Sequence, residues 1–186
     1  MNPRPVADTE TQLVHFMGPT DANSEGDVHG GVIMKLVDEA AALAAMKHAR
    51  RRVVTAAMDR MTFVVPIGVG DLVTFRAKVN AAWRSSMEIG VRVESENPLS
   101  GEVRYTNSAY VTLVALDEHA RPALVAPALA QSALEQRRMR EAELRRANRL
   151  TERKAILAGR ADDRGRRDGP RHRDRLARRE PASPPD

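Results

Sequence analysis

The sequence predicts an α+β fold in which an antiparallel sheet of about five strands packs on one long helix. Residues 30–48 form a helical stretch that is apolar on nearly every side, and such a helix belongs in a protein interior. Residues 73–79 and 87–93 instead alternate apolar with polar or charged side chains, the period of a strand with one covered face. A helix and a one-sided sheet can bury these two surfaces against each other.

The predicted helix begins at a double glycine. Gly30 and Gly31 follow a polar loop, and the N–H groups of a first helical turn have no helical carbonyl to bind. Because glycine has no side chain, a ligand carbonyl could approach these N–H groups closely. The helix would run to about His48. The arginines at 50–52 suit a helix end, with binding of a phosphate group as the alternative.

Strands are expected at 9–16, 53–63, 73–79, 87–94 and 103–116, with turns at 68–71 and 97–101. The organisation expected is a disordered leader at 1–8, one domain at 9–127, a C-terminal helix at 128–158, and a disordered basic tail at 159–186. The tail is rich in Arg, Asp, Gly and Pro, a composition that buries too little apolar surface to fold.

Composition excludes several functions. The chain has 186 residues, no cysteine and 3% aromatic residues, so thiolate chemistry is impossible and a base-stacking platform is disfavoured. Residues 1–134 have 13 Lys and Arg against 15 Asp and Glu, a net charge of −2, while residues 135–186 have 17 against 10, a net charge of +7. Apolar runs are too short for a bilayer and no signal peptide is recognisable, so a cytoplasmic protein without membrane or nucleic-acid partners is expected.

The segment around the double glycine resembles a known family. The residues Asp21-Ala22-Asn23, Gly26, His29-Gly30-Gly31 and Asp38-Glu39 are similar to the acyl-CoA hydrolase branch of the hotdog-fold thioesterases. The segments 53–56, 63–71, 86–88 and 114–117 extend the resemblance in the order of the family, over roughly residues 10 to 125.

The resemblance implies a hotdog fold and hydrolysis of fatty acyl-CoA to free fatty acid and CoA. It implies a catalytic Asn23, and Asp38 as a general base that activates water or, alternatively, as a nucleophile. The N–H groups of Gly30 and Gly31 would stabilise the oxyanion. It further implies that the strand junction at Arg84, Ser85 and Ser86 lies near the nucleotide end of CoA.

The residues alone leave alternatives open. Asp38 lies among small apolar neighbours, where a carboxylate needs a partner or a task, and an ion pair with Lys35 is the plainer interpretation. Asn23 fits an ordinary turn, and His29 fits either a structural loop residue or a base. The junction at residues 84–86 could be a solvated turn. The histidines show no metal-ligand spacing, so neither a metal nor a separate cofactor is expected.

Helix geometry bears on the oligomeric state. Gly31 and Asp38 are seven residues apart, or about 10 Å along a helix axis, so one thioester can hardly contact both in one chain. Two antiparallel helices would bring Gly31 of one beside Asp38 of the other, and the family places its active sites at a dimer interface. A homodimer, possibly a trimer of dimers, is therefore expected. The rival hypotheses are a non-catalytic acyl-CoA-binding or regulatory module and a protein that binds nucleic acid through its tail.

Overall fold

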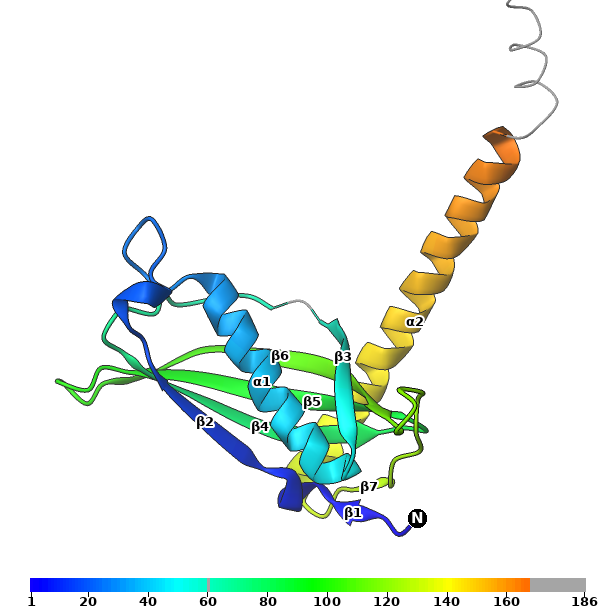
Figure 1. Ribbon diagram of the computed structural model, residues 1–186, viewed down its shortest axis with the longest axis horizontal. Helices are drawn as coiled ribbons and strands as arrows, with labels where there is room; N and C mark the ends of the chain where they lie inside the picture. The colour runs from blue at the N-terminus through cyan, green and yellow to red at the C-terminus, as the bar shows by residue number, and fades with distance from the viewer. Residues whose placement is uncertain (60, 168–186) are drawn as a thin grey trace, which may run out of the picture. The chain divides into compact units, whose positions relative to one another are not determined.

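The computed structural model describes residues 1–59 and 61–167, in which a curled antiparallel sheet wraps around one long helix (Figure 1). The chain divides into two compact units, Met1–Ala142 and Glu143–Asp186. The elements in chain order are β1 (Arg4–Pro5), a 3-10 turn (Val6–Thr9), β2 (Thr11–Phe16), a second 3-10 turn (Pro19–Asp21), α1 (Gly30–Ala49), β3 (Arg52–Met58), β4 (Leu72–Ala82), β5 (Ser86–Glu96), β6 (Val103–Leu116), β7 (Ala128–Leu129) and α2 (Ala133–Arg167).

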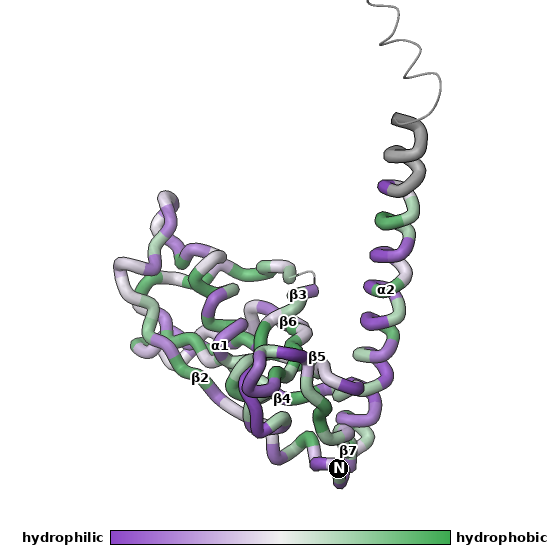
Figure 2. Tube along the Cα trace, turned by 45° about the vertical axis from the view of Figure 1, so that its right-hand side comes forward, coloured by the Kyte–Doolittle hydropathy of each residue, from purple (hydrophilic) through white to green (hydrophobic). Residues whose placement is uncertain are grey.

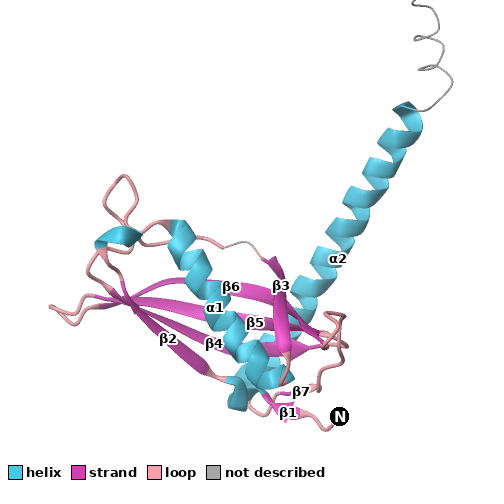
Figure 3. Cartoon of the chain, viewed as in Figure 1, coloured by secondary structure: helices cyan, strands magenta, loops and turns pink. Residues whose placement is uncertain are grey.

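The main sheet has the strand order β2-β4-β5-β6-β3, and every neighbouring pair is antiparallel. The helix α1 crosses one face of this sheet (Figure 3). The predicted arrangement of five strands on a central helix is confirmed. Strand β3 follows α1 directly in the chain. It lies at one edge of the sheet, where it pairs with β6.

The strand alternation separates two faces. The side chains that face α1 are almost completely buried and form the core with one side of the helix. On the other face, the polar and charged residues of β4, β5 and β6 are at least partly accessible in most positions. The core residues with the largest buried side chains include Ile33, Val37, Val73, Phe75, Val79, Met87, Ile89 and Leu113.

One side of α1 stays open in the single chain. Met34, Leu43 and Met46 are 44%, 41% and 40% exposed, so the predicted burial on nearly every side is wrong for one chain taken alone. The reason is that one chain supplies one sheet, which can cover only one side of a helix. Apolar residues on the uncovered side mark it as a contact surface.

The first residues are ordered, which corrects the expectation of a disordered leader at 1–8. Strand β1 pairs in parallel with β7, Val6 is 1% exposed, and the Arg4 guanidinium donates to the His48 carbonyl. The His48 ring is itself buried against the Ala126 carbonyl, with Nε2 and O 2.8 Å apart. Burial lowers the pKa of His48. A single buried valine and these backbone contacts anchor a segment whose composition gave no strand signal.

Two further boundaries differ from the prediction. Strand β3 ends at Met58 rather than 63, because the chain leaves the sheet edge after a register shift between Thr55 and Ala57. The C-terminal helix begins at Ala133 and continues to Arg167, so residues 159–167 are helical instead of disordered. The rest of the predicted tail, 168–186, lies outside the described residues.

The start of α2 has a specific cause. Ser132 and Glu135 form a capping box: the Ser132 hydroxyl accepts the Glu135 N–H at 3.2 Å, and Glu135 Oε2 accepts the Ser132 N–H at 3.1 Å. Glu135 also pairs with Lys78 of β4 at 3.1 Å. These contacts fix the first turn of α2 on the sheet. Hydrophilic residues predominate farther along the helix (Figure 2).

Candidate active site

A carboxylate and a hydroxyl meet on the open side of α1. The Thr55 hydroxyl of β3 donates to Asp38 Oδ1 at 2.5 Å. Asp38 lies in the middle of α1 at the margin of its buried face, while Thr55 is exposed on the edge strand. The predicted alternative partner, Lys35, instead pairs with Glu39 at 3.7 Å. Asp38 is therefore oriented by a neutral donor, and its carboxylate has no ion-pair partner among the described residues.

The start of α1 offers one open N–H group rather than two. His29 is the N-cap residue, and its Nδ1 accepts the Gly31 N–H at 2.9 Å. The Gly30 N–H has no acceptor among the described residues, so only it is open to a ligand carbonyl. In this bond Nδ1 is the acceptor, so the ring caps the helix start by its Nδ1 lone pair. This geometry favours a structural role for His29 over the catalytic role, the two alternatives that the sequence left open.

Asn23 shapes the loop ahead of the helix. Its Oδ1 accepts the N–H groups of Glu25 at 2.8 Å and of Asp27 at 3.2 Å, the arrangement of an Asx turn. Asn23 thus has the turn role that the sequence offered as one of its two interpretations. The Nδ2 group, which has no acceptor within the described parts of the chain, remains able to donate to a ligand or to water.

The junction of β4 and β5 lies near β3 in the register of the sheet. Ser86 is opposite Val114 of β6, and Val114 is opposite Val54 of β3, the residue before Thr55. Two strand steps of about 5 Å each separate these positions. The junction is braced by the Ala115 N–H bonded to the Ser85 carbonyl at 2.9 Å and by the Val125 N–H bonded to the Arg84 carbonyl at 3.1 Å. The Arg84 side chain is exposed.

Sequence reasoning assigned no role to two residues that the structure places beside the candidate groups. Thr55 was noticed only as part of the family-like segment 53–56, and Phe63 only as part of 63–71. A methyl group built on Gly30 would lie 3.4 Å from Phe63 Cζ, so the ring lies against the helix start. The resemblance at both segments was the available signal, but a contact across 17 or 33 residues cannot be read from spacing.

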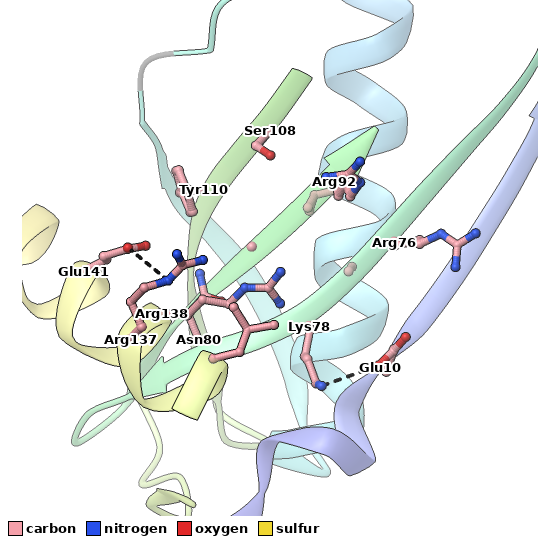
Figure 4. Close-up of a pocket in the computed structure, with 14 residues that line it drawn as sticks. Glu10, Arg76, Lys78, Asn80, Arg92, Ser108, Tyr110, Arg137, Arg138 and Glu141 are labelled. Atoms are coloured by element: carbon pink, nitrogen blue, oxygen red, sulfur yellow. Dashed lines mark ion pairs between the residues drawn. The ribbon is translucent and has the colours of Figure 1, made fainter. Parts of the chain in front are cut away.

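A cavity of about 400 Å³ lies elsewhere, on the face of the sheet away from α1 (Figure 4). Several of its cations are already paired with acids: Lys78 with Glu10 at 3.4 Å, and Arg137 with Glu141 at 3.6 Å. Its lining does not include Asp38 or Thr55. The cavity is therefore separate from the candidate site, and its lining is basic, with five cations, Arg76, Lys78, Arg92, Arg137 and Arg138, against the two acids Glu10 and Glu141.

No group of three or more His, Asp or Glu side chains is arranged to hold a metal ion within residues 1–59 and 61–167. Over the same part of the chain, none of the helices combines the length and apolar character needed to cross a membrane.

The chain is similar to known thioesterases. Residues 25–102 match the family model of the thioesterase superfamily. The acyl-CoA thioester hydrolase YkhA of Bacillus subtilis, itself uncharacterised, is 35% identical over 73% of this chain and 78% of its own length. A hexameric acyl-CoA thioesterase structure is 37% identical, with a TM-score of 0.78 over 82% of this chain and 97% of the other. This match confirms the hotdog fold.

The similarity is shorter for other relatives. The protein VdlD of Helicobacter pylori is 36% identical over 61% of this chain, and the match spans 65% of the length of VdlD.

Structures of an acyl-CoA hydrolase from Staphylococcus aureus, 28% to 29% identical with TM-scores from 0.72 to 0.76, include variants with one asparagine, one aspartate or one threonine changed to alanine. In that protein 15 residues separate the asparagine from the aspartate and 17 separate the aspartate from the threonine. The same separations relate Asn23, Asp38 and Thr55.

Proposed function

This chain belongs to the acyl-CoA thioester hydrolase family of the thioesterase superfamily, and on that basis we propose that it hydrolyses fatty acyl-CoA to a free fatty acid and CoA. The observation that carries the proposal is the Asp38 carboxylate, which is held by the Thr55 hydroxyl at 2.5 Å on the open side of a buried helix. A charged, oriented carboxylate without a counter-cation is suited to accept a proton.

Asp38 acts as a general base. It takes a proton from water as the water oxygen attacks the thioester carbonyl carbon, and the carbon–sulfur bond then breaks. The thiolate of CoA leaves and is protonated from the carboxyl group or from solvent. Thr55 restricts Asp38 to one orientation and leaves Oδ2 for the water. A thiolate is a good leaving group, so no strong general acid is required.

The oxyanion is stabilised at the N-terminus of α1. The Gly30 N–H is the open donor, and the partial positive charge of the helix terminus adds to its effect. The Asn23 amide donates to the carbonyl or to the water from the preceding loop. The Gly31 N–H contributes only when its hydrogen bond to His29 is broken. CoA lies along the surface, where Arg84 is available for a phosphate and Ser85 and Ser86 for hydrogen bonds.

The minimal active unit is a homodimer. Gly31 and Asp38 are about 10 Å apart along α1, so the oxyanion site of one chain serves the base of the other. The exposed Met34 and Met46 flank Asp38 on the helix surface, and a second copy of α1 would cover them. The relative solved as a hexamer supports further assembly into a trimer of dimers.

The decisive experiment is hydrolysis of acetyl-, butyryl- and palmitoyl-CoA, followed by reaction of the released thiol. Asp38→Asn keeps the shape of the side chain but removes the base, and we expect kcat to fall by about 100-fold or more. Glu39→Gln is the matched control, because Glu39 is the next residue and its one ion pair among the described residues is with exposed Lys35; its kcat should stay close to wild type. A folded Asp38→Asn protein with normal turnover would contradict the mechanism, and wild-type binding of acyl-CoA without turnover would favour the non-catalytic module.

A further inference from the structure

The described residues that follow β3, Asp59 and residues 61–67, form an arch held by backbone hydrogen bonds. The Asp59 N–H donates to the Tyr110 carbonyl at 2.9 Å, and the Val64 N–H donates to the Thr106 carbonyl at 3.4 Å, both on β6. The chain then turns to the loop ahead of α1, where the Val28 N–H donates to the Ile67 carbonyl at 2.8 Å. These contacts place Phe63 close to the start of α1 by backbone hydrogen bonds alone.

The Phe63 ring lies on Gly30. A methyl group on Gly30 would be 3.4 Å from Cζ and 3.6 Å from Cε2, while 47% of Phe63 remains exposed. Cα–Cβ bonds in a helix tilt toward its N-terminus, as do the open N–H groups of the first turn. The ring therefore lies on the side of Gly30 from which a carbonyl oxygen would approach.

This position requires the ring to contact any thioester bound there. The two arms of the thioester differ chemically: the acyl chain is apolar, whereas the pantetheine arm carries amides that need hydrogen bonds. The arch offers apolar surface, since Met61 packs against the core and Val64 is 67% exposed beside Phe63. An aromatic ring with exposed apolar neighbours matches the acyl arm.

We propose that Phe63 is a specificity-determining residue that packs on the first carbons of the acyl chain, beside the carbonyl held by Gly30. The inference rests on the proposed thioesterase activity and adds a residue to it. A side chain at position 30 that is larger than a methyl group would displace the ring, because the methyl group alone already lies at contact distance from it. Phe63 takes no part in proton transfer.

The test is the ratio of kcat/KM for butyryl-CoA to that for acetyl-CoA. Butyryl has two more methylenes, and each one that loses a buried contact lowers kcat/KM by about fourfold. Phe63→Ala should therefore lower the ratio by about fourfold to tenfold, and Phe63→Leu by less. Leu99→Ala is the control, since Leu99 is 97% exposed in the turn between β5 and β6 and should leave the ratio unchanged.

A double-mutant cycle with Gly30→Ala gives an independent result. In the wild-type background the new methyl group lies against the ring at van der Waals distance, whereas with Phe63→Ala it meets no ring, so the two effects on the ratio should not add. An unchanged ratio in active Phe63→Ala and Phe63→Leu proteins overturns this inference alone. A wild-type protein that hydrolyses none of acetyl-, butyryl- and palmitoyl-CoA overturns the proposed function and the inference together.

Discussion

At the scale of single residues, the hydrogen bond between Thr55 and Asp38 decides how the carboxylate can act. The open side of α1 gives Asp38 access to water, and Thr55 limits its rotation. A carboxylate free to rotate would spend less time aligned with the water, so in the proposed mechanism the hydroxyl acts through Asp38 as a positioning residue.

Replacement of Thr55 tests this role. Thr55→Val keeps the shape but removes the donor, and we expect kcat to fall by about tenfold, the loss of one oriented hydrogen bond to a charged group. Thr55→Ser retains the hydroxyl and should keep most of the activity. KM should change little for both, because neither variant alters the surface that binds CoA.

Steady-state kinetics with butyryl-CoA and a melting curve for each variant provide the measurement. Equal kcat for Thr55→Val and wild type would show that the carboxylate needs no fixed orientation. Equal losses of kcat in Thr55→Val and Thr55→Ser would point to packing of the side chain rather than to its hydrogen bond.

The candidate site could be predicted only in part at this scale. Local pattern identified Asp38 as a costly charge and Gly30 as an open helix start, because both depend on neighbours within two helical turns. It did not identify the Thr55 and Phe63 contacts, which depend on where β3 and the following arch return to α1. It also offered both glycine N–H groups as donors, since the cap by His29 depends on one side-chain rotamer.

At the scale of elements, long periodic segments were predictable and their ends were not. The alternation in β4 and β5 and the apolar pattern of α1 predicted these elements correctly, because many side chains contribute to each pattern. The residues before β2 were misjudged because their order rests on Val6 and on contacts to β7 and His48. The Ser132–Glu135 capping box was visible in the sequence as a Ser followed three residues later by Glu and would have given the correct start of α2.

Glu135 connects the first turn of α2 to the sheet and makes that connection dependent on pH. Burial raises the pKa of Glu135, but the Ser132 and Gln131 N–H groups and Lys78 more than offset this, and the pKa falls to about 2 from the ordinary 4.5. A depressed pKa stabilises the folded state fully above pH 4.5, and this contribution is lost as the pH falls toward 2.

Glu135→Gln should therefore melt at a lower temperature than wild type at pH 7. The difference in melting temperature should narrow below pH 4.5 as wild-type Glu135 becomes protonated. Glu152→Gln, on an exposed part of the same helix, serves as the control. A difference that stays constant from pH 7 to pH 3 would show that Glu135 acts through packing or hydrogen bonds that do not require its charge.

At the scale of the whole molecule, one chain has the parts of a site but does not bring them together. The proposed oxyanion donor at Gly30 and Asn23 lie at or before the start of α1, whereas Asp38 lies two turns farther along it. The same helix exposes Met34, Leu43 and Met46. An isologous dimer places two copies of one surface face to face. One such contact would bring Asn23 of one chain to Asp38 of the other and would also cover the exposed apolar residues of α1.

Mixed dimers test this arrangement directly. Asn23→Ala and Asp38→Ala chains should each be nearly inactive alone, since every site lacks either the amide or the base. In a mixed dimer one site receives Asn23 from one chain and Asp38 from the other, and the second site lacks both. Random association of equal amounts makes half of the dimers mixed, so about a quarter of the sites should be intact and about a quarter of wild-type activity should return.

The experiment requires proof that subunits exchange, which differently tagged chains purified in two steps would give. Each variant mixed with itself should gain no activity. Recovery near a quarter, with the KM of the wild type, means that complete sites form from two chains. If mixed dimers are isolated and remain inactive, Asn23 and Asp38 must act within one chain, because only that arrangement leaves every site in a mixed dimer with one defect.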